Sequence, residues 1–207
     1  LTAITNTKLL LNMADGQAID SAAQNNLTLY GNAKISSTQS KFGGTSMYFD
    51  GTGDYAVLNN SDTWAFGTGD FTVETWLYLN GTPSQYDYIF DMRNTSQTDN
   101  TWALSFNYMG TTDQFQFATN ISNTGTAILS AAYPPINQWV HIAVCRSGTT
   151  SRMFYNGTQS AINTSDSAVY INTGYAGHIG SRYSIEHNPN AYMDEIRFSK
   201  TARYTSN

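Results

Sequence analysis

The stretch KFGGTSMYFDGTGDYAVLNNSDTWAFGTGDFTVETWLYL, from Lys41 to Leu79, decides the fold class. Short runs of alternating apolar and polar residues are interrupted in it by Gly-Gly, Asp-Gly, Thr-Gly-Asp and Gly-Thr-Gly-Asp turns. Alternating runs bounded by turn residues are typical of β-strands. The pattern recurs along the rest of the chain, and no window of about a dozen residues keeps an amphipathic helical stripe. The sequence predicts an all-β protein, built as a two-sheet antiparallel jelly-roll β-sandwich.

Two of the predicted strands are expected in the interior of a sheet. In the run 71–79, Phe71 and Leu77 belong to an apolar face, whereas Glu74 and Trp76 belong to the opposite face, because side chains alternate along a strand. The run 139–145 is largely apolar on both faces. A strand that is apolar on both sides is typical of the middle of a sheet.

Length and composition predict that residues 1–207 form a single domain. The chain has 207 residues, of which 40% are hydrophobic and 14% aromatic, enough to build one large core. No charge run, low-complexity tract or internal repeat indicates a second domain. The step Asn156-Gly157 predicts a type I′ hairpin, because both residue types tolerate positive φ.

Charge and hydropathy exclude several classes of partner. Charged residues make up 12% of the chain, the formal net charge is -5, and the ten basic residues are scattered. Nucleic-acid binding needs clustered basic residues, so we expect no nucleic-acid partner. The aliphatic cluster 9–11 is too short for a membrane span or a signal peptide, so we expect neither in this chain. Cys145 has no disulfide partner and is expected to be an inert buried thiol.

The quoted stretch is accompanied by Trp139-Val-His-Ile-Ala-Val and Tyr192-Met-Asp-Glu-Ile-Arg-Phe. Together they resemble the laminin-G-like branch of the concanavalin A-like lectin superfamily over nearly the whole chain. The opening Thr7-Lys-Leu-Leu-Leu-Asn-Met and the closing Ala202-Arg-Tyr-Thr also resemble domains of bacteriophage tail and fibre proteins. This second resemblance implies host-surface adhesion and a virion-associated or extracellular location.

The same superfamily contains glycoside hydrolases with an E-x-D-x-x-E or E-x-D-x-E motif, which this chain lacks. Hydrolysis of a glycosidic bond needs two facing carboxylates. Glu74 stands alone on its strand face, and Asp194 and Glu195 are adjacent, so they point to opposite faces of a strand. His141, inside an apolar strand, is interpreted as a satisfied core histidine. We therefore expect no enzymatic activity.

Asp194 is a candidate for a structural calcium site. In a regular strand it would share a face with Tyr192, Ile196 and Phe198, where an ionised carboxylate needs donors or a cation. The family resemblance implies calcium between an acidic residue of the last strand and the loop after the first strand. The matching residues are Asp194 and Asp20, with backbone carbonyls near 15–16 and 25–26. The alternative is that Asp194 accepts backbone N–H bonds at a strand corner.

The loops after Tyr88-Ile-Phe-Asp-Met-Arg and after His178-Ile-Gly are similar in order to those of pentraxins, which hold calcium and ligand on one rim. The resemblance implies a rim built from residues 94–100 and 181–190. The acidic cluster of pentraxins is replaced in the second loop, which leaves Asp99 and Glu186 as secondary metal candidates.

The same rim suits direct sugar recognition, in which an aromatic ring stacks on the sugar while amides and carboxylates bind its hydroxyls. The candidate ligand-binding residues are Trp102, Tyr183, Glu186, His187, Asn188 and Asn190, with the segments 86–88 and 108–113 as secondary candidates. We therefore predict a non-enzymatic, lectin-like module for a cell-surface glycan or polysaccharide, bound through rim loops.

Two alternatives remain. One is a structural or oligomerisation module of a larger fibre, a homo-oligomer without a sugar site. The other is a polysaccharide-degrading hydrolase, whose activity would depend on Glu74.

Overall fold

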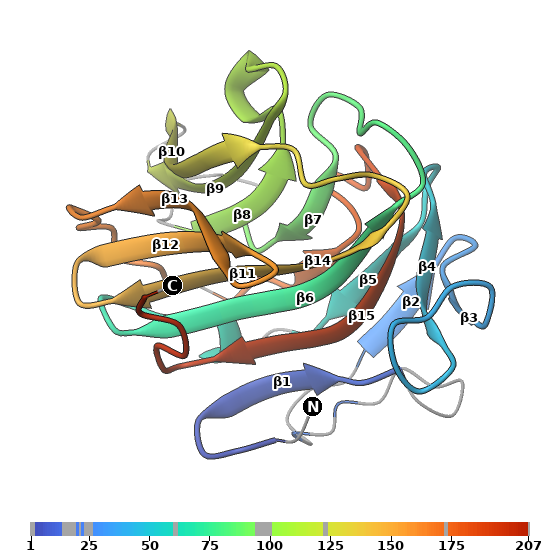
Figure 1. Cartoon of the computed structure of the whole chain (residues 1–207), viewed down its shortest axis with the longest axis horizontal. Coiled ribbons are helices and arrows are strands. Elements are labelled where there is room, and N and C mark those ends of the chain that lie inside the picture. The colour runs from blue at the N-terminus through green and yellow to red at the C-terminus, as the bar shows by residue number, and fades with distance from the viewer. Residues whose placement is uncertain are drawn as a thin grey trace.

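The computed structural model describes residues 3–13, 20, 22, 27–59, 62–93, 101–121, 124–171 and 174–206. These residues form two antiparallel β-sheets and two short 3₁₀ helices, η2 (Asp62–Trp64) and η3 (Tyr108–Gly110). No helix in these ranges is long and apolar enough to cross a membrane. The prediction of an all-β, two-sheet sandwich is confirmed (Figure 1).

The eight-stranded sheet has the order β13-β12-β11-β6-β15-β4-β3. β4 pairs with the N-terminal part of β15, and β1 pairs with its C-terminal part. Its strands are β13 (Thr158–Asn163), β12 (Thr150–Tyr155), β11 (Trp139–Ser147), β6 (Phe71–Leu79), β15 (Asn190–Ser199), β4 (Ser46–Asp50), β3 (Lys34–Ser36) and β1 (Thr7–Leu11). Both predicted interior strands are confirmed, because β6 lies between β11 and β15, and β11 lies between β12 and β6.

The seven-stranded sheet has the order β10-β9-β8-β7-β14-β5-β2, so strands distant in sequence lie side by side, as in a jelly roll. Its strands are β10 (Thr124–Ala132), β9 (Gln114–Ile121), β8 (Thr101–Phe106), β7 (Tyr88–Asp91), β14 (Gly177–Ile179), β5 (Tyr55–Leu58) and β2 (Leu27–Tyr30). Figure 1 shows β7, β8 and β9 above β6, β11 and β15 in the view.

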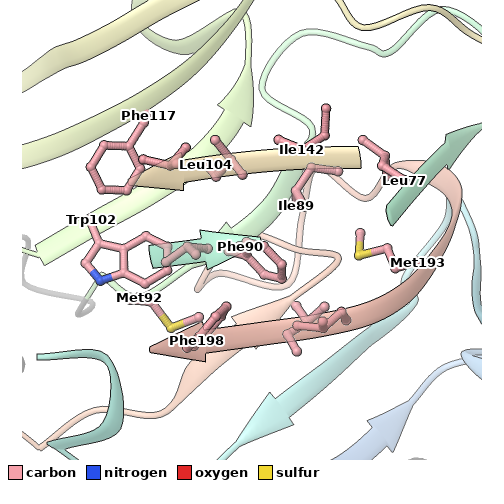
Figure 2. Close-up of a cluster of buried hydrophobic side chains, with 14 of the residues drawn as sticks. Leu77, Ile89, Phe90, Met92, Trp102, Leu104, Phe117, Ile142, Met193 and Phe198 are labelled. Carbon is pink, nitrogen blue, oxygen red and sulfur yellow. The ribbon is translucent and has the colours of Figure 1, made fainter. Parts of the chain in front are cut away.

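The hydrophobic core fills the space between the sheets (Figure 2). Leu77, Ile142 and Met193 enter it from the eight-stranded sheet, and each is at most 1% exposed. Phe90 and Leu104 enter it from the seven-stranded sheet. Burial of such side chains contributes about 1.5–3 kcal/mol each, so this layer supplies most of the stabilisation.

The hairpin between β12 and β13 turns at Asn156-Gly157, where φ is 50° and 82°. Positive φ at both central residues is the geometry of a type I′ turn, so that prediction is confirmed. The thiol of Cys145 is also buried as expected, at 1% exposure on β11.

A β-bulge divides β15 between Asp194 and Arg197, and Glu195 in it has φ 51°. The extra residue changes the alternation of side chains. Tyr192 pairs with Tyr78 on the outer face of the sheet, whereas Ile196, inside the bulge, lies in the core. The prediction that Asp194 shares a face with Ile196 and Phe198 is therefore wrong.

Candidate functional site

The loop 181–190 is fastened to the end of β7 at the rim of the sandwich. The Tyr183 backbone N–H donates to Asp91 Oδ2 at 3.1 Å. Asp91 also accepts two hydrogen bonds from the Arg93 guanidinium, at 2.6 and 2.7 Å, and both side chains are buried. A bidentate, buried pair of this kind holds its geometry well, so the loop is attached to a rigid point.

Three of the predicted ligand residues in this loop have different exposures. The Tyr183 ring is partly buried, with the guanidinium groups of Arg93 and Arg182 at 5.5 and 4.9 Å from its centre. The His187 ring packs edge-on against Tyr86 at 5.4 Å, and burial, with the Arg182 charge, lowers its pKa. Glu186 is 65% exposed and lies 3.9 Å from His187. Of these three residues, the loop therefore offers Glu186 most openly to a ligand.

Asn188 fastens the loop to the turn 50–54. Its Nδ2 donates to the Asp54 and Gly180 carbonyls at 2.9 and 3.0 Å, and its Oδ1 accepts the Gly53 N–H at 3.0 Å. With these three bonds made, the amide has little capacity left for a sugar hydroxyl. The turn 50–54 is itself closed by Asp54, whose Oδ2 accepts the Asp50 N–H at 2.8 Å, as the interpretation of this segment as a turn requires.

Next to this loop is a polar hollow of about 290 Å³, which we call the rim hollow. It is lined by Asp50, Gly51, Leu79, Asn80, Gly81, Thr82, Pro83, Ser84, Asp87, Asn188, Pro189 and Asn190. Asn190 is exposed and accepts a hydrogen bond from Asn80 Nδ2 at 2.6 Å. Asp87 is 5% exposed, and burial raises its pKa to about 6 against the opposing Ser84 N–H bond. The hollow can bind hydroxyl groups, but it contains no aromatic ring among its described lining residues.

Trp102 does not belong to the rim. It is fully buried, points into the core between the sheets, and donates its indole N–H to the Trp64 carbonyl at 2.9 Å (Figure 2). The prediction of Trp102 as a ligand-binding residue is wrong, because β8 is buried on both of its faces. Asp99 and the rim segment 94–100 lie outside the described residues.

The two carboxylates proposed for a structural calcium already have hydrogen-bond donors. Asp194 Oδ2 accepts the N–H groups of Lys41 and Phe42, both at 2.9 Å, and its Oδ1 accepts that of Glu195 at 2.8 Å. Burial raises the pKa of Asp194, and these bonds oppose the rise. Asp20 Oδ1 accepts the N–H groups of Leu10 and Ala22, both at 2.9 Å.

This arrangement matches the strand-corner alternative for Asp194, because three backbone N–H groups satisfy its carboxylate without a cation. Among the described residues there is no group of three or more His, Cys, Asp or Glu that could hold a metal ion. The carbonyls near 15–16 and 25–26 lie outside the described residues, so calcium binding stays a prediction.

The outer face of the eight-stranded sheet carries a row of aromatic side chains that the prediction did not single out. Across neighbouring strands, Trp139 pairs with Tyr78, Tyr78 with Tyr192, and Tyr192 with Tyr48. The ring centres lie 5.6, 6.0 and 4.6 Å apart along this row. We call these four residues the aromatic row. Such cross-strand contacts fix the rings in place.

The row opens at Trp139 into a hollow of about 480 Å³, which we call the aromatic groove. It is lined by Lys41, Glu74, Trp76, Trp139, His141, Asn156 and Tyr204. The Trp76 and His141 rings pack at 5.3 Å, and the exposed Phe42 meets Trp76 edge-on at 5.8 Å. Partly exposed aromatic rings beside polar groups are typical of sugar-binding sites.

Glu74 lies at the floor of the groove in a dense set of donors. Arg197 donates to its Oε1 at 2.6 Å, and its Oε2 lies 2.7 Å from Tyr204 Oη and 3.1 Å from His141 Nε2. Burial raises the pKa of Glu74, but the hydrogen bond from His141 and the Arg197 charge outweigh it, so the pKa is lowered. Glu74 is thus an ionised anchor that positions Tyr204 and His141.

His141 is satisfied by Glu74, as predicted, but it lies on the outer face with 18% of its side chain exposed, so its placement in the core is wrong.

The C-terminal segment forms one wall of the groove. Ala202 and Tyr204 pack on Ala143, Cys145 and Phe154 and cover this part of the outer face. The segment is fastened by the Thr72 hydroxyl, which donates to the Thr201 carbonyl at 2.8 Å and accepts the Arg203 N–H at 3.0 Å. The loop 41–42, held by Asp194, forms the opposite wall. Figure 1 shows the C-terminus in front of this sheet.

Similar folds occur in bacterial toxins. The binding domain of Paraclostridial Mosquitocidal Protein 1 matches with a TM-score of 0.74 at 11% identity, over 95% of this chain and 49% of that one. The binding domain of botulinum neurotoxin DC, solved in complex with SialylT, matches with a TM-score of 0.73 at 12% identity, over 96% and 48%. The binding domain of botulinum neurotoxin serotype G matches with a TM-score of 0.72 at 12% identity, over 95% of this chain and 48% of that one. The chain thus spans about half the length of these domains.

Because these structures share so little sequence with the chain, their similarity establishes the fold alone. The family follows from sequence comparison. No curated protein sequence matches the chain. The profile of the concanavalin A-like lectin/glucanases superfamily matches residues 50–206, which include β6, β11 and β15. The chain therefore belongs to the concanavalin A-like lectin/glucanase superfamily.

Proposed function

We propose that this protein is a lectin-like recognition module that binds a cell-surface glycan or polysaccharide in the aromatic groove. The observation that carries the proposal is the groove itself, where Trp76 and Trp139 stand partly exposed beside Asn156 and Lys41. Such rings can stack on the apolar face of a sugar while the polar groups bind its hydroxyls. The similar toxin domain solved with SialylT supports the use of this fold for sugar binding.

The aromatic groove is favoured over the rim as the main site. The rim hollow is smaller, at about 290 against 480 Å³, and the described residues that line it include no aromatic side chain. The exposed Glu186 and Asn190 and the partly exposed His187 remain candidates for a second contact region.

A non-enzymatic role is part of the proposal. Glu74 is the one carboxylate among the described residues that line the groove, and it is paired with Arg197 rather than with a second carboxylate. Glycoside hydrolysis uses two carboxyl groups, one of them with a raised pKa, whereas the pKa of Glu74 is lowered. These properties suit an electrostatic anchor better than a general acid.

The biological setting follows from the sequence resemblance to bacteriophage tail and fibre domains. We propose that the domain is virion-associated or otherwise extracellular and attaches its parent protein to a host surface. Several copies in one fibre would raise the avidity of a weak sugar site. A purely structural module of a fibre is the alternative, and it predicts no glycan binding.

A glycan and bacterial-polysaccharide array tests the function. Wild-type protein is expected to bind at least one class of glycan, and Trp139→Ala to weaken that binding about tenfold or more, because the ring provides a stacking surface. A run with calcium and a run with a chelator separate direct binding from binding through the predicted calcium.

Tyr175→Ala is a matched control, since Tyr175 is 38% exposed and does not line the groove. Thermal unfolding of each variant confirms that it is folded. Absence of wild-type binding in both runs contradicts the proposal and favours the structural module.

A further inference from the structure

The aromatic groove and the aromatic row are flanked by two exposed lysines. Lys41 Nζ lies 4.2 Å from the centre of the Trp76 ring and 5.7 Å from that of Phe42. Lys34 pairs with Tyr48 across β3 and β4, and its Nζ lies 5.8 Å from the Tyr48 ring. Neither lysine takes part in any ion pair found within the described residues. Both ammonium groups are therefore held over aromatic rings and open to solvent.

The carboxylates near the groove are buried and already have hydrogen-bond donors. Glu74 is 1% exposed, its Oε1 lies 2.6 Å from Arg197 Nη2, and Arg203 Nε lies 3.4 Å from the same oxygen. Asp194 is fully buried and accepts its three backbone N–H bonds. The exposed charge along the walls of the groove is consequently that of Lys41, in a chain whose net charge is -5.

Asp50, at the far end of the row, is a competing negative charge near Tyr48. Burial and Tyr192 raise the pKa of Tyr48 most, and the Asp50 charge raises it further. Its Oδ1 accepts the Thr52 N–H at 2.8 Å and its Oδ2 accepts the Asn32 side-chain N–H at 3.2 Å. These bonds turn both of its oxygens toward the 50–54 turn and toward Asn32. Asp50 still places a negative charge near the ring that Lys34 covers, whereas the carboxylates near Lys41 are buried, so Lys41 is the stronger of the two anion contacts.

We propose that the ligand is an acidic glycan, which lies across the strands from Trp139 to Tyr48 with a carboxylate or sulfate group on Lys41 and a second one near Lys34. This inference rests on the proposed function and adds the class of sugar. The row crosses β11, β6, β15 and β4, a span of about 14 Å at about 4.8 Å per strand, so it accommodates several sugar units rather than a single terminal one. Lysine binds such anions as a mobile point charge, which suits a flexible polymer.

Matched pairs of glycans on one array test the charge requirement: sialylated and desialylated glycans, polyuronates and their carboxyl-reduced forms, and sulfated chains and their desulfated forms. Wild-type protein is expected to prefer the acidic member of a pair by about tenfold. Lys41→Gln is expected to lower the affinity for that member about fivefold, and Lys34→Gln by less. Raising the salt concentration is expected to lower the affinity for the acidic glycan as well, because salt screens the attraction between lysine and the anion.

Lys200→Gln is the charge-matched control, because Lys200 follows the end of β15 that lies away from Tyr192. If both members of every pair bind equally and Lys41→Gln changes neither affinity, the inference is overturned. The lectin function would then still stand. Absence of binding to acidic and neutral glycans alike contradicts the proposed function itself, so the two failures are distinguishable.

Discussion

Glu74 and Asp87 are two buried carboxylates with opposite environments. Glu74 has Arg197, His141 and Tyr204 as donors, and its pKa is lowered although burial alone raises it. Asp87 has the Ser84 N–H at 2.7 Å and no described cation, so burial dominates and raises its pKa to about 6. The same burial therefore gives an ionised anchor at one site and a carboxyl that resists ionisation at the other.

Asp87 gives a pH-dependent stability that can be measured. Its pKa rises from 3.8 in the unfolded chain to about 6 in the folded protein, so the folded state holds its proton more tightly. The carboxyl therefore destabilises the fold increasingly as the pH rises from about 4 to 6, and fully above that. Asp87→Asn keeps an acceptor for the Ser84 N–H without the charge. Its melting temperature should exceed that of wild type at pH 7.5, and the difference should disappear near pH 4.

Asp113→Asn serves as the control for this comparison, because Asp113 is exposed on a turn. Equal melting temperatures of Asp87→Asn and wild type at pH 7.5 would show that Asp87 is better solvated than its burial implies.

Among the elements, strands β6 and β11 and the β12–β13 hairpin were predictable from sequence. Alternation identified β6, a doubly apolar run identified β11, and Asn156-Gly157 identified the turn. These signals are local, because side-chain periodicity and positive φ depend on neighbouring residues. The bulge in β15 has no comparable signal, and it reversed the predicted face of Ile196.

The hairpin turn gives a prediction at the scale of the element. Gly157 has φ 82°, and a Cβ added there meets no atom within 4 Å, so Gly157→Ala tests backbone strain alone. The expected cost is about 1 kcal/mol of unfolding free energy, from denaturant titration. Gly81→Ala is the matched control, since its added Cβ also meets nothing within 4 Å and its φ is not positive. Similar costs for both variants would contradict a strained type I′ turn.

For the whole molecule, the sandwich was predictable and the site was not. The groove combines the loop at Lys41, the strand residues Trp76 and Trp139, and the C-terminal Tyr204. No sequence spacing joins segments so far apart, although the position of Trp76 beside Glu74 on the polar face of β6 was a usable signal. Trp102 was mistaken for a rim residue because its place at the start of a strand does not reveal that both faces of β8 are buried.

The central claim is that the glycan contacts the aromatic groove, and tryptophan indole signals test it most directly. Trp76 and Trp139 line the groove, whereas Trp64 and Trp102 are fully buried and serve as internal references. A ¹H–¹⁵N NMR titration with the strongest glycan from the array should shift the indole N–H signals of Trp76 and Trp139 and leave those of Trp64 and Trp102 in place. Shifts confined to backbone amides of residues 181–190, with all four indoles unchanged, would place the ligand on the rim and contradict the account.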